Sequence, residues 1–191
     1  GSLRKVFTAE DRNALYIRLA LLFWFFGYQG ILPFLTMYTR DAIGVSEGTA
    51  GLSPGMFAAA YALFAIPSGI AAHRFGRKRT IRVSLLVIVL LCTLLFLHKP
   101  LAAGLRLGDA AGLAVFWALL FVFGAFWVSV ITNSFPMLWQ MASYETMGIY
   151  TGLYYTFSQA AAILSPPVTG SLLDLAGFRS IFFFGALCRL V

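Results

Sequence analysis

A few polar and aromatic side chains interrupt the long apolar segments of this chain, and these residues are its candidates for ligand chemistry. Amide groups both donate and accept hydrogen bonds, and phenols do the same, so both suit the hydroxyl groups of a sugar. An indole adds a flat apolar surface on which a sugar ring could stack. The candidate contacts that supply these groups are Gln159, Gln29, Tyr28, Tyr155, Tyr154, Asn133 and Trp127.

A proline and the spacing of the polar residues give these candidates a structural setting. Pro33 lacks an N–H group, so it should bend the first apolar segment and free a backbone carbonyl one turn earlier. Tyr155 and Gln159 are four residues apart and therefore share one helix face, which Gly148 and Gly152 continue. The glycines predict a close backbone approach to another helix. We take Gln159 as the best single candidate for a solute contact.

Each candidate also has a purely structural interpretation. Amides commonly bond across helices in membrane bundles, which would explain Gln29 and is the favoured interpretation of Asn133 beside Pro136. Core packing or the membrane interface would explain Tyr154 and Tyr155 equally well. The residues alone leave these alternatives open.

The chemistry that the chain lacks is equally informative. All seven acidic residues fall near the ends of apolar segments, so no mid-segment carboxylate is available to bind a proton or a sodium ion. His73 and His98 also lie at segment ends, and Cys92 and Cys188 lie within apolar stretches as small hydrophobes. Enzyme chemistry, a metal site, a disulfide framework and a cofactor are therefore not expected. Asn133 is not followed by proline, which excludes the paired half-helices of an aquaporin-like channel.

Composition indicates which elements must position these side chains. The chain has 191 residues, of which 60% are hydrophobic and 11% charged, with a net charge of +7, and its mean hydropathy is +0.85. The cations cluster at segment ends and are not interleaved along a polar face, so nucleic acid is not an expected partner. Crossing a bilayer takes about 20 apolar residues. Five segments meet this length, at about 13–38, 49–72, 80–97, 110–137 and 148–173, whereas 178–191 is too short to cross.

These segments predict an all-α, polytopic membrane protein with a six-helix bundle. Unpaired backbone groups exclude other lipid-exposed structures, and the strands of a barrel would alternate in polarity. A basic hairpin between the second and third segments should stay in the cytoplasm, together with the N-terminus. Its cations are Arg74, Arg77, Lys78, Arg79 and Arg82. We expect a multi-pass integral protein of the plasma (inner) membrane, in which residues 1–12 form a cytoplasmic flank that begins with a cloning-type dipeptide, Gly1-Ser2.

The basic hairpin carries an ordered pattern of glycine and arginine, Gly69-x-x-Ala72-x-Arg74-Phe75-Gly76-Arg77-Lys78-Arg79. It resembles the signature Gly-x-Leu-Ala-Asp-Arg-x-Gly-Arg-Arg/Lys that the major facilitator superfamily carries between the second and third helices of each six-helix half. His73 stands where the family has an acidic residue that helps to latch a gate, and a neutral imidazole cannot supply that charge. The gating-loop residues that the resemblance implies are Gly69, His73, Arg74, Gly76, Arg77, Lys78 and Arg79.

Further segments resemble the sugar/cation symporters of this family, near the glycoside and sucrose/proton branch. Residues 133–139, 148–155 and 165–167 are similar to the tenth and eleventh helices, and residues 23–28 add to the likeness in the first segment. The resemblance implies that residues 13–191 form the C-terminal half of a twelve-helix transporter, with the N-terminal half missing. It also implies that this half consists of two inverted three-helix repeats.

On this resemblance we expect a secondary transporter that moves a small polar solute, a sugar or glycoside, by alternating access with proton or sodium coupling. Its partners would be the solute, the coupling ion, membrane lipid and the N-terminal six-helix half, which would also carry the coupling acid. Two alternatives stay open. One is an autonomous six-helix half or scaffold that pairs with a second copy of itself, and the other is a facilitator-type exporter of amphiphilic compounds.

Overall fold

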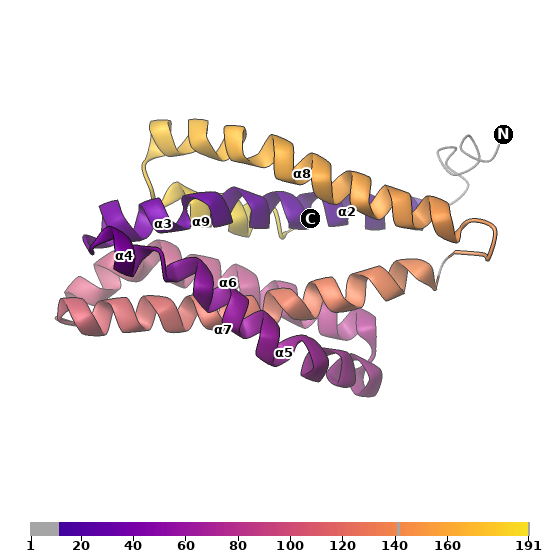
Figure 1. The fold of residues 1–191 in the computed structure, drawn as a ribbon, viewed down its shortest axis with the longest axis horizontal. Coiled ribbons are helices and arrows are strands. Elements are labelled where there is room, and N and C mark those ends of the chain that lie inside the picture. The colour runs from indigo at the N-terminus through magenta and orange to yellow at the C-terminus, as the bar shows by residue number, and fades with distance from the viewer. Residues whose placement is uncertain (1–11, 141, 191) are drawn as a thin grey trace.

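The computed structural model describes residues 12–140 and 142–190, and the regular structure in these residues is entirely helical. Long helices run roughly along one axis of the molecule (Figure 1). The main elements are α2 (Arg12–Ile31), α5 (Ser53–Phe75), α6 (Arg77–Gly104), α7 (Asp109–Trp139), α8 (Met147–Ala176) and α9 (Ser180–Leu187). The predicted all-α class is confirmed.

The first membrane segment is broken where the sequence predicts a bend. α2 ends at Ile31, and a 3-10 turn, η1 (Leu32–Phe34), follows with Pro33 inside it. A proline cannot donate the helical hydrogen bond and clashes with the preceding turn, so the backbone tightens there. The chain continues through α3 (Leu35–Met37), the π-helical η2 (Tyr38–Ile43) and α4 (Glu47–Ala50).

Stretches long and apolar enough to cross a membrane are found at four places in the described part of the chain: Leu19–Ile43, Glu47–Phe75, Arg77–Gly104 and Asp109–Trp139. α8 has 30 residues and is amply long enough, but it is more polar than these four. α9 has only 8 residues. The more polar composition of α8 indicates that part of its surface does not face lipid.

α6 extends at both ends beyond the predicted segment 80–97. Its first turn contains Arg77, and its last turn reaches Gly104. At that end the Nε2 atom of His98 lies 2.8 Å from the carbonyl oxygen of Gly112 on α7, which ties the two helices together. Hydropathy alone does not register this side-chain contact across the turn.

The long helices can be grouped in chain order into two three-helix units, α2/α5/α6 and α7/α8/α9, and the first helix of each unit packs against the other unit. α2 packs mainly on α8 and α9, whereas α7 packs mainly on α5 and α6. The first helix of each unit therefore contacts the second and third helices of the other unit. α2 and α7 run in opposite directions (Figure 1). This is the pairing that two inverted three-helix repeats produce.

Close backbone contact occurs at glycines in the middle of the bundle. A Cβ atom on Gly124 of α7 would lie 2.8 Å from Ala60 Cβ of α5, and one on Gly30 of α2 would lie 2.5 Å from Thr169 Oγ1 of α8. Gly148 and Gly152, which the sequence predicts to be sites of close approach, have no neighbour within 4 Å. Helix contact in this chain therefore depends on other small residues, and this face of α8 is left uncovered.

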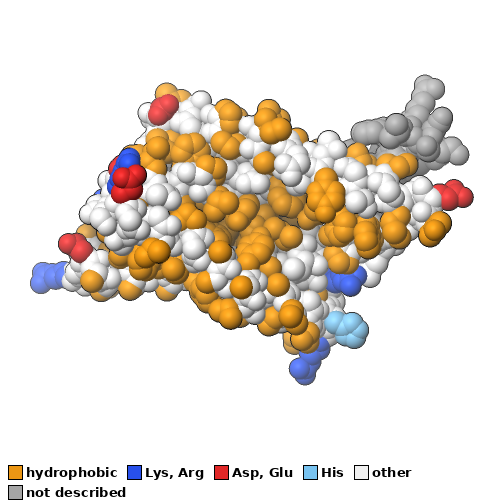
Figure 2. Space-filling view, viewed as in Figure 1, with side chains coloured by type: hydrophobic (Ala, Val, Ile, Leu, Met, Phe, Trp, Pro, Cys, Tyr) orange, Lys and Arg blue, Asp and Glu red, His pale blue; other side chains and the backbone are white. Residues whose placement is uncertain are grey.

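Charged side chains lie at the ends of the molecule, and an apolar belt lies between them (Figure 2). Large apolar side chains on this belt are exposed, including Ile66 at 77%, Leu86 at 68% and Ile163 at 70%. Such exposure is expected where hydrocarbon surrounds the protein. The chain is an integral membrane protein.

We expect Gly124→Ala to destabilise the bundle, because the added Cβ would force α5 and α7 apart. Overpacking of this kind costs about 1–3 kcal/mol, so the apparent unfolding temperature in detergent should fall. Gly55→Ala is the matched control, because Gly55 lies in α5 with no neighbour within 4 Å. Equal melting temperatures for the two variants would contradict the close contact.

Candidate functional site

An aromatic cluster joins α2, α5 and α7 near the centre of the bundle. The ring of Tyr28 stacks on Trp127, with centroids 4.7 Å apart and an interplanar angle of 20°. Tyr28 also meets Phe57 of α5 edge-on at 5.9 Å, and Phe25 meets Trp127 edge-on at 5.7 Å. Rings in these offset and edge-on geometries add stability beyond simple area burial. The cluster fixes the position of Tyr28 relative to α7.

One side of this cluster opens into a cavity of about 520 Å³ between α2 and α5. Its lining residues are Tyr28, Leu32, Pro54, Phe57, Ala58 and Tyr61. Tyr28 and Tyr61 are both half-buried, so each phenol combines an apolar ring with a hydroxyl that can donate and accept. Of the sequence-predicted candidates, Tyr28 is the one that lines this cavity. Tyr61 was missed, although it is an isolated phenol in the middle of an apolar segment.

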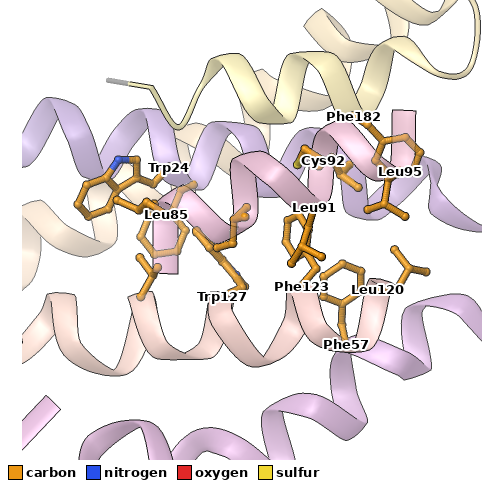
Figure 3. Close-up of a cluster of buried hydrophobic side chains, with 14 of the residues drawn as sticks. Trp24, Phe57, Leu85, Leu91, Cys92, Leu95, Leu120, Phe123, Trp127 and Phe182 are labelled. Atoms are coloured by element: carbon orange, nitrogen blue, oxygen red, sulfur yellow. The ribbon is translucent and has the colours of Figure 1, made fainter. Parts of the chain in front are cut away.

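Trp127 is fully buried, and it supports the cavity wall from behind. Figure 3 shows its indole among the apolar side chains between α7 and the neighbouring helices. The predicted stacking of this indole on a solute would need Tyr28 to move away first. In the described conformation Trp127 positions Tyr28.

Asn133 lies inside the contact between α5 and α7. It is 2% exposed, and its Nδ2 atom donates to the carbonyl oxygens of Ser129 at 2.8 Å and Ser68 at 3.5 Å. The hydroxyl groups of Ser68 and Thr132 are 2.8 Å apart in the same place. The bond to Ser68 and the contact between the two hydroxyl groups join α7 to α5, whereas the bond to Ser129 lies within α7.

The candidates on α8 point in two directions. Tyr154 is buried and meets Phe25 and Phe135 edge-on, with centroids 5.6 and 4.9 Å away. Tyr155 is 55% exposed, and Gln159 is exposed on the same face. Tyr154 therefore fastens α8 to α2 and α7, whereas Tyr155 and Gln159 face away from the bundle.

We call the outward stripe of Gly148, Gly152, Tyr155, Thr156 and Gln159 the polar face of α8; its residues are exposed throughout. Gln29, the remaining candidate, is half-buried on α2. The candidates are thus divided among the cavity, the helix contacts and this outward face. The structure does not bring them together into one pocket.

The basic hairpin forms the tight turn that its glycine predicts. Gly76 has φ +88°, a conformation that residues with a Cβ rarely adopt, and its N–H donates to the carbonyl of Ala72 at 2.9 Å. A cavity of about 630 Å³ lies between the hairpin and the end of α7, at Met137 and Gln140. Within the described residues, no ion pair involves a hairpin cation, and His73 is exposed.

The remaining feature that was not anticipated is Arg189. It follows α9 in a strongly apolar segment and is 4% exposed. The signal in the sequence was a lone cation ten residues after Arg179, within the last apolar run. The described residues contain no group of three metal-ligating side chains, and both cysteines are buried thiols.

Comparison with known proteins relates the whole bundle to one family. Residues 18–188 match the family profile described as Major Facilitator Superfamily. A curated rice protein (Oryza sativa subsp. japonica) named "Probable anion transporter 7" is 32% identical over 151 residues, which is 76% of this chain. The chain spans only 31% of the length of that relative.

The buried amide of Asn133 and the exposed amide of Gln159 provide a test of the site geometry. We expect Asn133→Ala to lower the free energy of unfolding in detergent by about 1–2 kcal/mol, because it removes a buried interhelical bond and leaves a small void. Gln159→Ala should leave the unfolding temperature of the chain unchanged, because its side chain is exposed. The reverse ranking of the two variants would contradict the placement of these side chains.

Proposed function

The chain belongs to the major facilitator superfamily, and we propose that it forms one half of a secondary transporter that moves a small polar solute by alternating access. The family is one of transporters and not of enzymes. In this proposal residues 13–191 are the C-terminal six-helix half, and the N-terminal half completes the solute path from the opposite side. The basic hairpin lies on the cytoplasmic side, where its cations meet acidic lipid headgroups and gate the path.

The observation that carries this proposal is the polar face of α8. Gln159 and Thr156 are exposed near the middle of a 30-residue helix. A polar side chain at that depth is costly in hydrocarbon and is normally found against another helix or a water-filled path. Gly148 and Gly152 on the same face have open space around them, which suits close contact with a second bundle. The face therefore fits an opposing half or the solute path between halves.

For the solute we propose a sugar or glycoside. The Tyr28 and Tyr61 phenols on the α2–α5 cavity and the amide of Gln159 offer hydrogen bonds without a fixed charge. The acidic residues of the described chain lie at helix ends, where Asp41 is paired with Arg40 at 2.6 Å. A proton or sodium ion that drives transport would consequently bind to a carboxylate of the other half.

A small anion is the second candidate solute. The relative from rice is named as an anion transporter, and the chain carries a net charge of +7. The same cavity would then receive the uncharged part of the solute. The two classes differ in one measurable respect, because anion binding weakens as ionic strength rises whereas glycoside binding does not.

The experiment uses the full-length transporter, reconstituted in liposomes, and measures solute-dependent thermal shift and uptake for a panel of glycosides and of small carboxylates. We expect saturable glycoside binding that is insensitive to salt. Binding of carboxylates alone would select the anion proposal in its place, and no saturable uptake of any member by the folded protein would reject the transport proposal for both classes.

We further expect Gln159→Ala to weaken solute binding by roughly three- to tenfold, the loss of about one hydrogen bond, while the melting temperature stays unchanged. Thr93→Ala is the control. Thr93 is exposed on α6 and bonds only to the carbonyl of Val89 in its own helix. Unchanged affinity in Gln159→Ala would remove this residue from the solute path.

A further inference from the structure

The α2–α5 cavity is lined by one face of α5 and by two residues that stand opposite. The lining residues on α5 follow helical spacing and therefore share a face of that helix: Pro54, Phe57, Ala58 and Tyr61. Tyr28 of α2 and Leu32 of η1, four residues apart, form the other wall. All of these residues lie between positions 28 and 61, so neither end of the described chain contributes to the wall.

Contacts behind the walls fix the shape of this cavity. Tyr28 rests on the buried indole of Trp127, with 4.7 Å between the ring centroids. Phe57 is 3% exposed, and it projects from α5 toward Phe123 of α7, whose ring it meets edge-on at 5.1 Å (Figure 3). Rings packed in this way have few alternative positions. The aromatic lining is therefore in place before a solute arrives.

The lining offers two polar side-chain groups, the hydroxyls of Tyr28 and Tyr61. Within the described residues neither hydroxyl makes a hydrogen bond, and both keep accessible surface. The Tyr61 hydroxyl also lies within electrostatic range of the Tyr28 hydroxyl. A group bound in the cavity can therefore reach both hydroxyls, each of which donates and accepts.

This lining does not suit a whole sugar ring. A sugar carries hydroxyl groups around its ring, and each hydroxyl that is buried without a partner is costly. Two phenols satisfy only a small part of that requirement. The remaining lining residues, Leu32, Pro54, Phe57 and Ala58, present carbon surface alone.

The same lining suits a flat apolar group that ends in a polar one. The volume of about 520 Å³ exceeds what a single ring fills, and it is typical of pockets for small organic molecules. The rings of Tyr28, Phe57 and Tyr61 can meet an aromatic guest edge-on or in offset stacks. The two hydroxyls would then meet the polar atoms attached to that guest.

We propose, on the basis of the proposed glycoside transport, that the α2–α5 cavity binds the aromatic aglycone of an aryl glycoside. The aglycone lies against Leu32, Phe57 and Ala58, and the sugar begins at the hydroxyls of Tyr28 and Tyr61. The rest of the sugar extends into the solute path, where the opposing half supplies further hydrogen bonds. The cavity thereby selects glycosides that carry a ring over simple sugars.

The test compares phenyl β-glucoside with methyl β-glucoside by isothermal titration of the full-length transporter in lipid nanodiscs. The two ligands share the sugar and differ in the aglycone. We expect phenyl β-glucoside to bind roughly ten- to hundredfold more tightly, as burial of a ring of this size predicts. Binding is measured at equilibrium, so the readout does not require transport.

A matched pair of variants locates the aglycone. Ala58 and Ala59 are both exposed on α5, but of the two only Ala58 lines the cavity. Ala58→Leu fills the space, so the preference for the phenyl ligand should fall to about threefold or less while methyl β-glucoside binds as before. Ala59→Leu should retain the native preference. Tyr61→Phe keeps the ring and loses a hydroxyl, so both glucosides should bind roughly three- to tenfold more weakly.

The outcomes separate this inference from the proposed function. Equal affinity of the native protein for the two glucosides would overturn the aglycone site and leave glycoside transport standing. No binding of either glucoside by the folded protein would overturn both. A native-like phenyl preference in Ala58→Leu would also overturn the site. If Ala58→Leu does not fold, Tyr61→Phe decides, and unchanged affinity for both glucosides in that variant overturns the proposal.

Discussion

The burial of the Trp127 indole between α2, α7 and the end of α9 is the contact on which the arrangement of this bundle depends. Tyr28 stacks on it from α2, Phe25 meets it edge-on, and the Arg189 guanidinium lies over it. The most extensive helix contacts involve α2 or α7: α7 with α5 and with α6, and α2 with α8. Because lipid supplies no hydrophobic force between helices, contacts of this kind and the close glycine approaches determine which helices meet.

The same constraint sorts the polar residues by role. Asn133 and Ser165 direct their bonds to neighbouring helices, the latter to the carbonyl of Phe26 at 2.5 Å. Tyr28 and Tyr61 retain hydroxyls beside an open cavity, and Gln159 faces outward. A polar group that is neither bonded inside nor placed at a membrane surface needs a further partner. That requirement is the physical basis of the proposed solute path and of the proposed opposing half.

Much of the fold could be predicted because apolar length, proline and charge position act locally. The helical class, the break at Pro33 and the left-handed Gly76 follow from the backbone chemistry of single residues. The inverted pairing of helices required the family resemblance, since hydropathy does not say which helices touch. The extension of α6 through residues 98–104 was not predicted, because hydropathy ends the apolar segment at residue 97 and does not register the contact between His98 and Gly112 of α7.

The site was less predictable, because a residue type fixes what a side chain can bond but not where it points. Gln159 and Tyr155 lie on one exposed face, as their spacing predicts, yet Tyr154, a phenol like Tyr155, is buried, and so is Trp127. Gly148 and Gly152 predicted a close contact that this chain does not make within itself. Arg189 was missed because a lone cation in an apolar run carries no spacing pattern.

The most direct measurement concerns what surrounds Gln159 in the intact protein. Gln159→Cys would be introduced into the full-length transporter with the buried Cys92 and Cys188 replaced by alanine, and compared with Leu86→Cys on the exposed apolar belt. A solute path predicts that a membrane-impermeant maleimide labels position 159 and that solute protects it, while position 86 reacts only with a lipid-soluble reagent. Equal, lipid-restricted labelling at both positions would show that the polar face of α8 contacts hydrocarbon, and would contradict the proposed role of this bundle.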